Sequence, residues 1–132
     1  ELASKENVAD AVRFLGRLPN SEVLDHVSGV AAMVVNSNVE TFSVVTGEAL
    51  AQGKPVIATR CGGPVAFITP TNGLLIEPKD TGALCDAMLD LTAHAGRYDP
   101  AAIRADLSDR FSPARVAHQF KTIYSNALTH AQ

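Results

Sequence analysis

The sequence is poor in the residues on which several classes of protein depend. Its two cysteines, Cys61 and Cys85, have neither the spacing of a CxxC pair nor that of metal ligands, so we expect reduced, free thiols. Its four histidines are scattered, and none stands at ligand spacing from Cys, Asp or Glu. There is no G-x-S-x-G stretch and no Cys–His arrangement of a nucleophilic hydrolase. We therefore predict no metal site, and no covalent catalysis of these kinds.

Charge and hydropathy argue against two further kinds of partner. The 132 residues include 11 Lys and Arg against 14 Asp and Glu, with no basic run, so nucleic acid and anionic membrane surfaces are not predicted partners. No apolar run approaches the roughly 18–20 residues of a membrane span, and the first residues lack a signal-peptide pattern. The sequence therefore predicts one cytoplasmic domain, with 46% hydrophobic residues to form its core.

Apolar runs alternate with helical patterns along most of the chain. Strands are predicted at residues 11–15, 30–38, 55–60 and 72–78, because these runs are short, largely apolar and bounded by Gly, Pro or small polar residues. Helices are predicted at 19–29, 43–53, 80–96, 100–110 and 113–130, with a single turn near 65–68. This alternation is typical of an α/β, Rossmann-like fold, a parallel sheet with helices on both faces.

The predicted fold indicates where a ligand would bind. In an open parallel sheet, ligands lie beyond the carboxyl ends of the strands, where loops lead into helices. Residues 16–17, 36–43 and 59–64 are polar or glycine-rich and follow predicted strands. We expect these three loops to converge at one edge of the sheet.

The stretch ETFSVVTGE, residues 40–48, has a glutamate at each end of an otherwise uncharged run. If Ser43 is the N-cap of the helix that Gly53 ends, the N–H groups of residues 44–46 are free to bind an anion such as phosphate. Glu48 would then accept hydrogen bonds from ribose hydroxyls, and Glu40 would face the group beyond the phosphates. The alternative is that both glutamates are solvated surface charges.

Three further residues of this region carry predictions of their own. Phe42 is expected to anchor the loop by packing inward. Gly47 lies inside the predicted helix at a cost of about 1 kcal/mol relative to alanine, which indicates close approach by a ligand or a strand. Gly62 and Gly63 offer backbone without a Cβ, either to a ligand or simply to a tight turn.

The run NVETFSVVTGEALAQGKPVIATRCGGP, residues 38–64, resembles a known family. It is similar to the C-terminal domain of retaining "group 1" glycosyltransferases of the GT-B fold. Their pattern is two acidic residues separated by seven others, the EX7E motif, followed by a G-x-P turn and a strand that ends in Gly-Gly. The resemblance covers about residues 10–92.

The resemblance implies a role for each matching residue. Glu48 corresponds to the glutamate that binds the ribose hydroxyls of a nucleotide-sugar donor, and Glu40 to the catalytic one near the transferred sugar. Phe42, Ser43 and Val44 correspond to positions whose N–H groups meet the diphosphate, with Gly62 and Gly63 close to the substrate. The implied donor is a UDP- or GDP-sugar, used without a metal ion or other cofactor to glycosylate a hydroxyl group with retention.

The sequence also departs from the family pattern. Thr41 stands where the family commonly has Gly, and Ala66 where it commonly has an acidic residue. The Arg and Lys that grip the diphosphate in the family lie on a strand–helix unit upstream of Glu1, as does the acceptor domain. We therefore expect residues 1–132 to be a fragment with half a donor site, inactive alone. Any membrane association would come from the missing N-terminal domain.

Two other interpretations remain open at this stage. One is a nucleotide- or ligand-binding α/β domain without catalysis, and the other is a receiver-like domain, which would need acidic residues at the strand ends. Phe120, Ile123, Tyr124 and Leu128 stand at helical spacing and are expected to pack across the domain or against the missing half. A partner-binding groove is the alternative for that face.

Overall fold

The structure is a computed structural model that describes residues 1–130, apart from the side chain of His130. Three parallel strands form one sheet in the order β1-β2-β3, namely β1 (Met33–Val35), β2 (Val56–Thr59) and β3 (Gly73–Ile76). The central strand is β2, and all four of its residues are buried. Three of the four predicted strands therefore form, each shorter at its ends than predicted.

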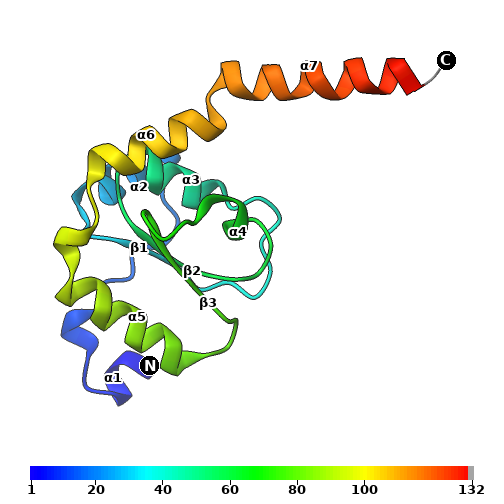
Figure 1. The fold of residues 1–132 in the computed structure, drawn as a ribbon. Coiled ribbons are helices and arrows are strands. Elements are labelled where there is room, and N and C mark those ends of the chain that lie inside the picture. The colour runs from blue at the N-terminus through cyan, green and yellow to red at the C-terminus, as the bar shows by residue number, and fades with distance from the viewer. Residues whose placement is uncertain (131–132) are drawn as a thin grey trace.

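Helices surround this sheet (Figure 1). In chain order they are α1 (Leu2–Lys5), the 3-10 turn η1 (Ala9–Ala11), α2 (Asn20–Gly29), α3 (Val44–Ala51), α4 (Pro64–Phe67), α5 (Thr81–Ala93), the 3-10 turn η2 (Ala95–Arg97), α6 (Pro100–Phe111) and α7 (Pro113–His130). Helix α3 packs on β1 and β2, whereas α5 packs on β2 and β3 from the opposite side of the sheet. The predicted α/β class with helices on both faces is confirmed.

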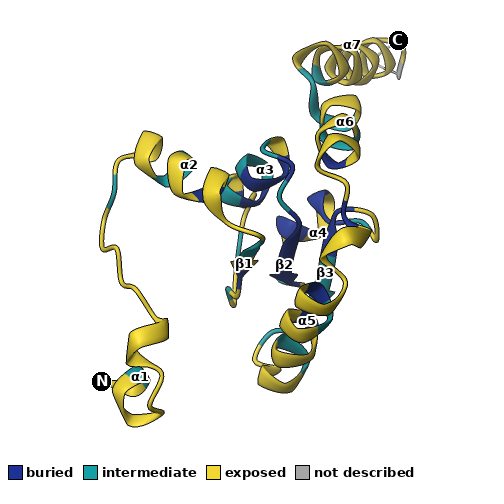
Figure 2. Cartoon of the chain, turned by 90° about the vertical axis from the view of Figure 1, so that its left-hand side faces the viewer, coloured by how far each residue is buried: buried dark blue, intermediate teal, exposed yellow. Residues whose placement is uncertain are grey.

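The core lies on both faces of the sheet, where α3 and α5 pack on it, and extends to α6 (Figure 2). Leu50 of α3, Val56 and Ile57 of β2, and Ile103 of α6 are at most 1% exposed. Burial of such side chains contributes about 1.5–3 kcal/mol each. Since α3 is fixed on the sheet by this core, the position of its first residues is fixed as well.

The strand predicted at residues 11–15 is not present. Apart from the end of η1, these residues have no regular structure and are exposed, and Phe14 is 85% exposed. A strand is stable only when a neighbouring strand takes up its backbone hydrogen bonds. Within residues 1–130, β1 pairs with β2 alone, and no strand pairs with residues 11–15. An apolar run was therefore insufficient to form a strand here.

Helix α7 projects from the body of the molecule beyond α6 (Figure 1). Its apolar residues Phe120, Ile123, Tyr124 and Leu128 are between 53% and 72% exposed. The prediction that they pack across the domain is thus wrong. Packing against another part of the protein stays a prediction. Within the described residues, no helix is long and apolar enough to cross a membrane.

Candidate functional site

Two of the three predicted loops meet at the carboxyl ends of β1 and β2. The Glu40 N–H donates to the Cys61 carbonyl at 3.0 Å, and the Gly63 N–H donates to the Glu40 carbonyl at 2.9 Å. The acidic loop 36–43 is therefore hydrogen-bonded along the loop 59–64, as predicted. The third loop, 16–17, follows no strand, so its place at a strand end is wrong.

The glycine pair is explained by this loop-to-loop contact. A Cβ at Gly62, whose φ is +111°, would collide with the Glu40 carbonyl oxygen. A Cβ at Gly63 would lie 2.7 Å from the Phe42 Cα and closer still to the Phe42 carbonyl group. Only glycine allows so close an approach of two backbones. A contact of Gly62 or Gly63 with a ligand stays a prediction.

Glu40 is half-buried and is held by a short chain of hydrogen bonds. The Ser37 hydroxyl donates to Glu40 Oε1 at 2.9 Å. The buried Thr59 hydroxyl in turn donates to the Ser37 carbonyl oxygen at 2.5 Å, which ties the loop to the end of β2. No Lys, Arg or His within residues 1–129 forms an ion pair with Glu40 or Glu48. Both carboxylates therefore keep oxygens available for hydroxyl groups.

Ser43 immediately precedes α3, as predicted, but its side chain does not cap the helix. Its hydroxyl pairs with the Thr46 hydroxyl at 2.8 Å, and its carbonyl accepts from the Thr46 N–H at 3.0 Å. The prediction of three free N–H groups is therefore wrong for Thr46. The N–H groups of Val44 and Val45 have no acceptor within residues 1–130. Together with the positive end of the helix dipole they can bind an anion.

The backbone of Ser43 has a positive φ of 65°. Residues other than glycine rarely adopt this left-handed conformation, and such outliers concentrate at functional sites. Here the conformation turns the chain from the acidic loop into α3 within one residue. The serine is 4% exposed, so its surroundings hold it in place.

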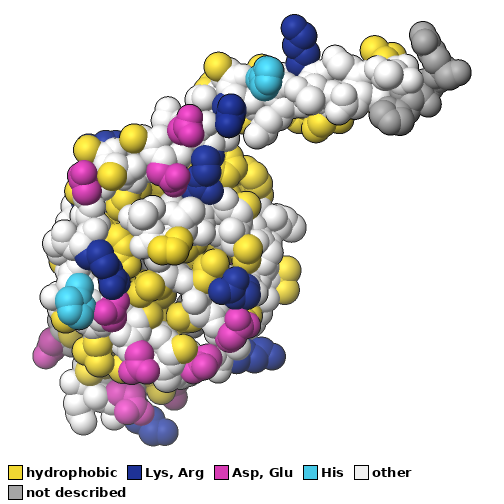
Figure 3. Space-filling view, viewed as in Figure 1, with side chains coloured by type: hydrophobic (Ala, Val, Ile, Leu, Met, Phe, Trp, Pro, Cys, Tyr) yellow, Lys and Arg dark blue, Asp and Glu magenta, His cyan; other side chains and the backbone are white. Residues whose placement is uncertain are grey.

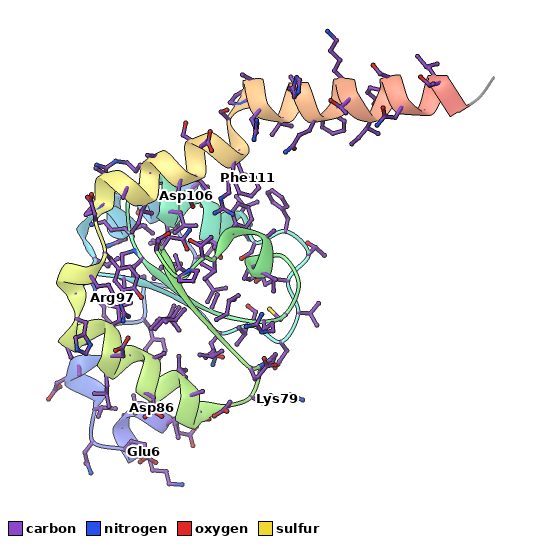
Figure 4. The ribbon with its side chains drawn as sticks, viewed as in Figure 1. Glu6, Lys79, Asp86, Arg97, Asp106 and Phe111 are labelled. Carbon is purple, nitrogen blue, oxygen red and sulfur yellow. The ribbon has the colours of Figure 1, made fainter. Side chains whose placement is uncertain are left out.

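Phe42 does not pack inward as predicted, because the residue is 57% exposed. It touches Phe67 edge-on, with the ring centroids 5.2 Å apart. Phe67 also stacks on Phe111 at 4.7 Å, and Figure 4 shows Phe111 at the end of α6 that faces α4. A Cβ at Gly47 would lie 3.3 Å from the Phe67 ring, so Gly47 is approached by this side chain and not by a strand.

These aromatic rings border a cavity of about 680 Å³ between α3, α4, α6 and the start of α7. Figure 3 shows hydrophobic side chains gathered below the junction of α6 and α7. Three predicted site residues, Phe42, Val44 and Glu48, line the cavity. Its other lining residues are Gly47, Ala51, Phe67, Arg104, Leu107, Ser108, Phe111, Ser112 and Val116.

Glu48, in the second turn of α3, has a partner that the sequence did not predict. The Asn20 side-chain amide at the start of α2 donates to Glu48 Oε1 at 3.0 Å. These residues are 28 positions apart and lie on two helices, so no local spacing could have linked them.

Arg60 and Arg110 are engaged with partners outside the candidate site. Arg60 pairs with Glu77 at 3.1 Å. Arg110 donates to the carbonyl groups of Ala66 and Phe67 and pairs with Asp106, which fixes α6 over α4 (Figure 4). Among the side chains that the structure describes, no group of three or more His, Cys, Asp or Glu is arranged to hold a metal ion.

One ion-paired cluster lies outside this site, on α5 and η2. The hydrogen bond from Arg97 holds the pKa of the Asp90 carboxyl below its ordinary value of 3.8, against partial desolvation and with help from His94. The same bond, with one to the Tyr98 hydroxyl, raises the pKa of Arg97. This cluster joins η2 to α5 and has no part in the candidate site.

Comparison with known proteins identifies the family of this chain. A sequence model of the family "Glycosyl transferases group 1" matches residues 1–94. The chain belongs to this family. The matched part corresponds to the C-terminal domain of the GT-B fold, which confirms the resemblance found in the motifs.

Individual proteins that are similar to this glycosyltransferase domain support the same family assignment. It is 32% identical over 131 residues to a D-inositol 3-phosphate glycosyltransferase of Corynebacterium urealyticum, covering 98% of this chain and 31% of that protein. A sucrose-phosphate synthase structure from Thermosynechococcus elongatus has a TM-score of 0.81 and 29% identity, over 98% of this chain and 33% of that one. HepE of Anabaena, solved with UDP-glucose, shares the fold at a TM-score of 0.77 and 22% identity, over 94% of this chain and 35% of that one. The chain thus spans about a third of these proteins.

Proposed function

We propose that this domain binds the donor of a retaining glycosyltransferase, which moves a sugar from a UDP- or GDP-sugar to a hydroxyl group. The observation that carries the proposal is the acidic loop held against Gly62 and Gly63 at the start of α3. It joins Glu40, the free N–H groups of Val44 and Val45, and Glu48 within nine consecutive residues. HepE, whose structure was solved with UDP-glucose, supports a nucleotide sugar as the ligand class.

The proposed mechanism assigns one part of the donor to each group. The diphosphate binds at the N-terminus of α3, where the N–H groups and the helix dipole stabilise the charge that develops as the nucleotide leaves. The ribose hydroxyls bind the Glu48 carboxylate. The transferred sugar lies near Glu40, which is the catalytic carboxylate of this proposal. In this scheme no metal ion or other cofactor is needed.

The rest of the protein is the proposed partner of this domain. The exposed apolar face of α7 and the apolar cavity beside α6 support such a partner, because an isolated helix gains little from exposed Phe120 and Ile123. The relatives are about three times as long as the matched part. Ile123→Ser should lower the melting temperature of the full-length protein more than Thr122→Ser does. Equal melting temperatures would contradict this partner.

The location is proposed to be the cytoplasm. Cys61 and Cys85 are free thiols, as a reducing compartment favours. Any association with a membrane is assigned to the rest of the protein.

A transfer assay tests the proposed function. The full-length protein is incubated with UDP-glucose or GDP-mannose and hydroxyl acceptors, with and without EDTA, and the product is examined by proton NMR. We expect a product with the anomeric configuration of the donor and a rate that EDTA does not change. An inverted product contradicts retention, and loss of activity with EDTA contradicts metal independence. Binding of the nucleotide without transfer to any acceptor would instead favour the non-catalytic alternative.

A further inference from the structure

The hydrogen bond between Asn20 and Glu48 joins two helices at the proposed donor site. Asn20 is the first residue of α2, and its amide nitrogen lies 3.0 Å from Glu48 Oε1. An ionised carboxylate only accepts hydrogen bonds, so the amide must present its nitrogen. Helix α2 packs on α3, with Val27 only 5% exposed between the helix and the core. The amide group that donates this hydrogen bond therefore belongs to a helix that is itself packed on α3.

The partners of Glu40 and Glu48 differ from those of the other paired carboxylates. Within residues 1–130, Glu77, Asp90 and Asp106 form ion pairs with arginines, and Asp80 and Asp99 cap helices. Glu40 and Glu48 each accept one hydrogen bond from a neutral side chain, Ser37 and Asn20 respectively. A neutral donor orients a carboxylate without cancelling its charge. Such a partner suits a carboxylate that must still bind something else.

The geometry leaves most of the acceptor capacity of Glu48 unused. A carboxylate has two oxygens with about four lone-pair directions, and Asn20 occupies one of these on Oε1. No other described residue donates to the Glu48 carboxylate. The free acceptors match two adjacent hydroxyl groups, provided that the carboxylate is held in one orientation. A free glutamate side chain loses conformational entropy when it becomes ordered, which weakens binding.

We propose that Asn20 is a positioning residue that orients the Glu48 carboxylate toward the ribose hydroxyls of the donor nucleotide. This inference rests on the proposed function, which assigns the ribose to Glu48. Asn20 acts through Glu48 and does not itself touch the ribose. Its loss therefore weakens the ribose hydroxyl contacts specifically and leaves the diphosphate contacts at α3 unchanged.

The test compares nucleotides with and without ribose hydroxyls. Calorimetry gives the affinity of the full-length protein for UDP, for GDP and for their 2′,3′-dideoxy analogues. The wild type should prefer the better-bound nucleotide over its dideoxy analogue by about 10- to 100-fold, as expected for hydrogen bonds to a charged group. Glu48→Gln should largely remove this preference.

Asn20→Ala should reduce the same preference by about 3- to 10-fold, the size of one hydrogen bond, without changing the affinity for the dideoxy analogue. That unchanged affinity also shows that the variant is folded. Asn20→Asp keeps the shape of the side chain but places a second carboxylate beside Glu48. It should therefore reduce the preference for the ribose nucleotide at least as much as Asn20→Ala does. Ser21→Ala, the next residue of α2 and also exposed, is the matched control and should retain the full preference.

The other outcomes distinguish a failure of the inference about Asn20 from a failure of the proposed function. If Glu48→Gln loses the preference and Asn20→Ala keeps it, Asn20 is not a positioning residue and the proposed function stands. If Asn20→Ala weakens UDP and dideoxy-UDP equally, its role is structural and the inference is wrong. If the wild type itself does not distinguish the two nucleotides, the ribose assignment of Glu48 fails, and the inference about Asn20 fails with it.

Discussion

Replacing Gly63 by alanine should separate the two loops that form the candidate site. The φ and ψ of Gly63, −45° and −47°, are accessible to alanine, so the backbone itself is not strained by the change. The new Cβ would lie 2.7 Å from the Phe42 Cα, whereas ordinary contacts begin near 3.4 Å. Because backbone atoms surround this position, the acidic loop must move by several tenths of an ångström or more.

That movement weakens the two hydrogen bonds between the loops, from the Glu40 N–H to Cys61 and from the Gly63 N–H to Glu40. At about 0.5–1.5 kcal/mol each, their loss lowers the free energy of unfolding by about 1–3 kcal/mol, the usual range for overpacking. Urea denaturation of the 132-residue chain measures the change. The matched control is Gly29→Ala, at the end of α2, where a Cβ meets nothing within 4 Å.

Gly63→Ala should also weaken the binding of UDP, since it displaces the loop that leads to the N-terminus of α3. Equal unfolding free energies for Gly63→Ala and Gly29→Ala would refute the steric argument. If Gly63→Ala is destabilised but binds UDP with unchanged affinity, the contact between the two loops does not contribute to nucleotide binding.

Two further predictions concern side chains with defined partners. Ser37→Ala removes the hydroxyl that donates to Glu40, so transfer by the full-length protein should slow by about 3- to 10-fold at unchanged UDP affinity. Ser37→Thr keeps a hydroxyl and should restore the rate of transfer. A fall in UDP affinity alone would contradict this role of Ser37. The pKa of Asp90 is lowered in the folded protein by Arg97, so its stabilising effect is present above pH 3.8 and is lost as the pH falls through the lower folded value. Asp90→Asn should therefore lower the unfolding free energy at pH 7, and the difference from the wild type should shrink toward pH 3; a difference independent of pH would argue against this linkage.

The sequence predicted elements best where local chemistry determines them. The apolar run at β2 gave a fully buried strand, and Asp80 accepts a hydrogen bond from the Ala83 N–H at the start of α5, at the predicted boundary. Helix α3 lies between Ser43 and Gly53, as predicted. The strand predicted at residues 11–15 does not form, because a strand depends on a neighbouring strand, and a local sequence pattern carries no information about that neighbour.

The candidate site was predicted as a set of residues but not as a set of contacts. The convergence of loops 36–43 and 59–64 followed from the fold, since carboxyl ends of parallel strands share one edge. The Phe42 contact with Phe67, the strained backbone of Ser43 and the Asn20–Glu48 hydrogen bond all depend on residues that are distant in sequence or on an unusual backbone conformation. None of these has a periodic signal.

The central claim is that the two glutamates bind different parts of one donor, and one pair of variants tests it most directly. Glu40→Gln and Glu48→Gln are made in the full-length protein, and each is measured for UDP affinity by calorimetry and for transfer with saturating donor. Glu40→Gln should leave UDP affinity unchanged and slow transfer by about 100-fold or more, the size seen when one preorganised electrostatic group is lost. Glu48→Gln should weaken UDP and the nucleotide sugar alike, by about 1.5–3 kcal/mol. If Glu40→Gln weakens the binding of UDP as much as Glu48→Gln does, the proposed division between sugar and ribose is wrong.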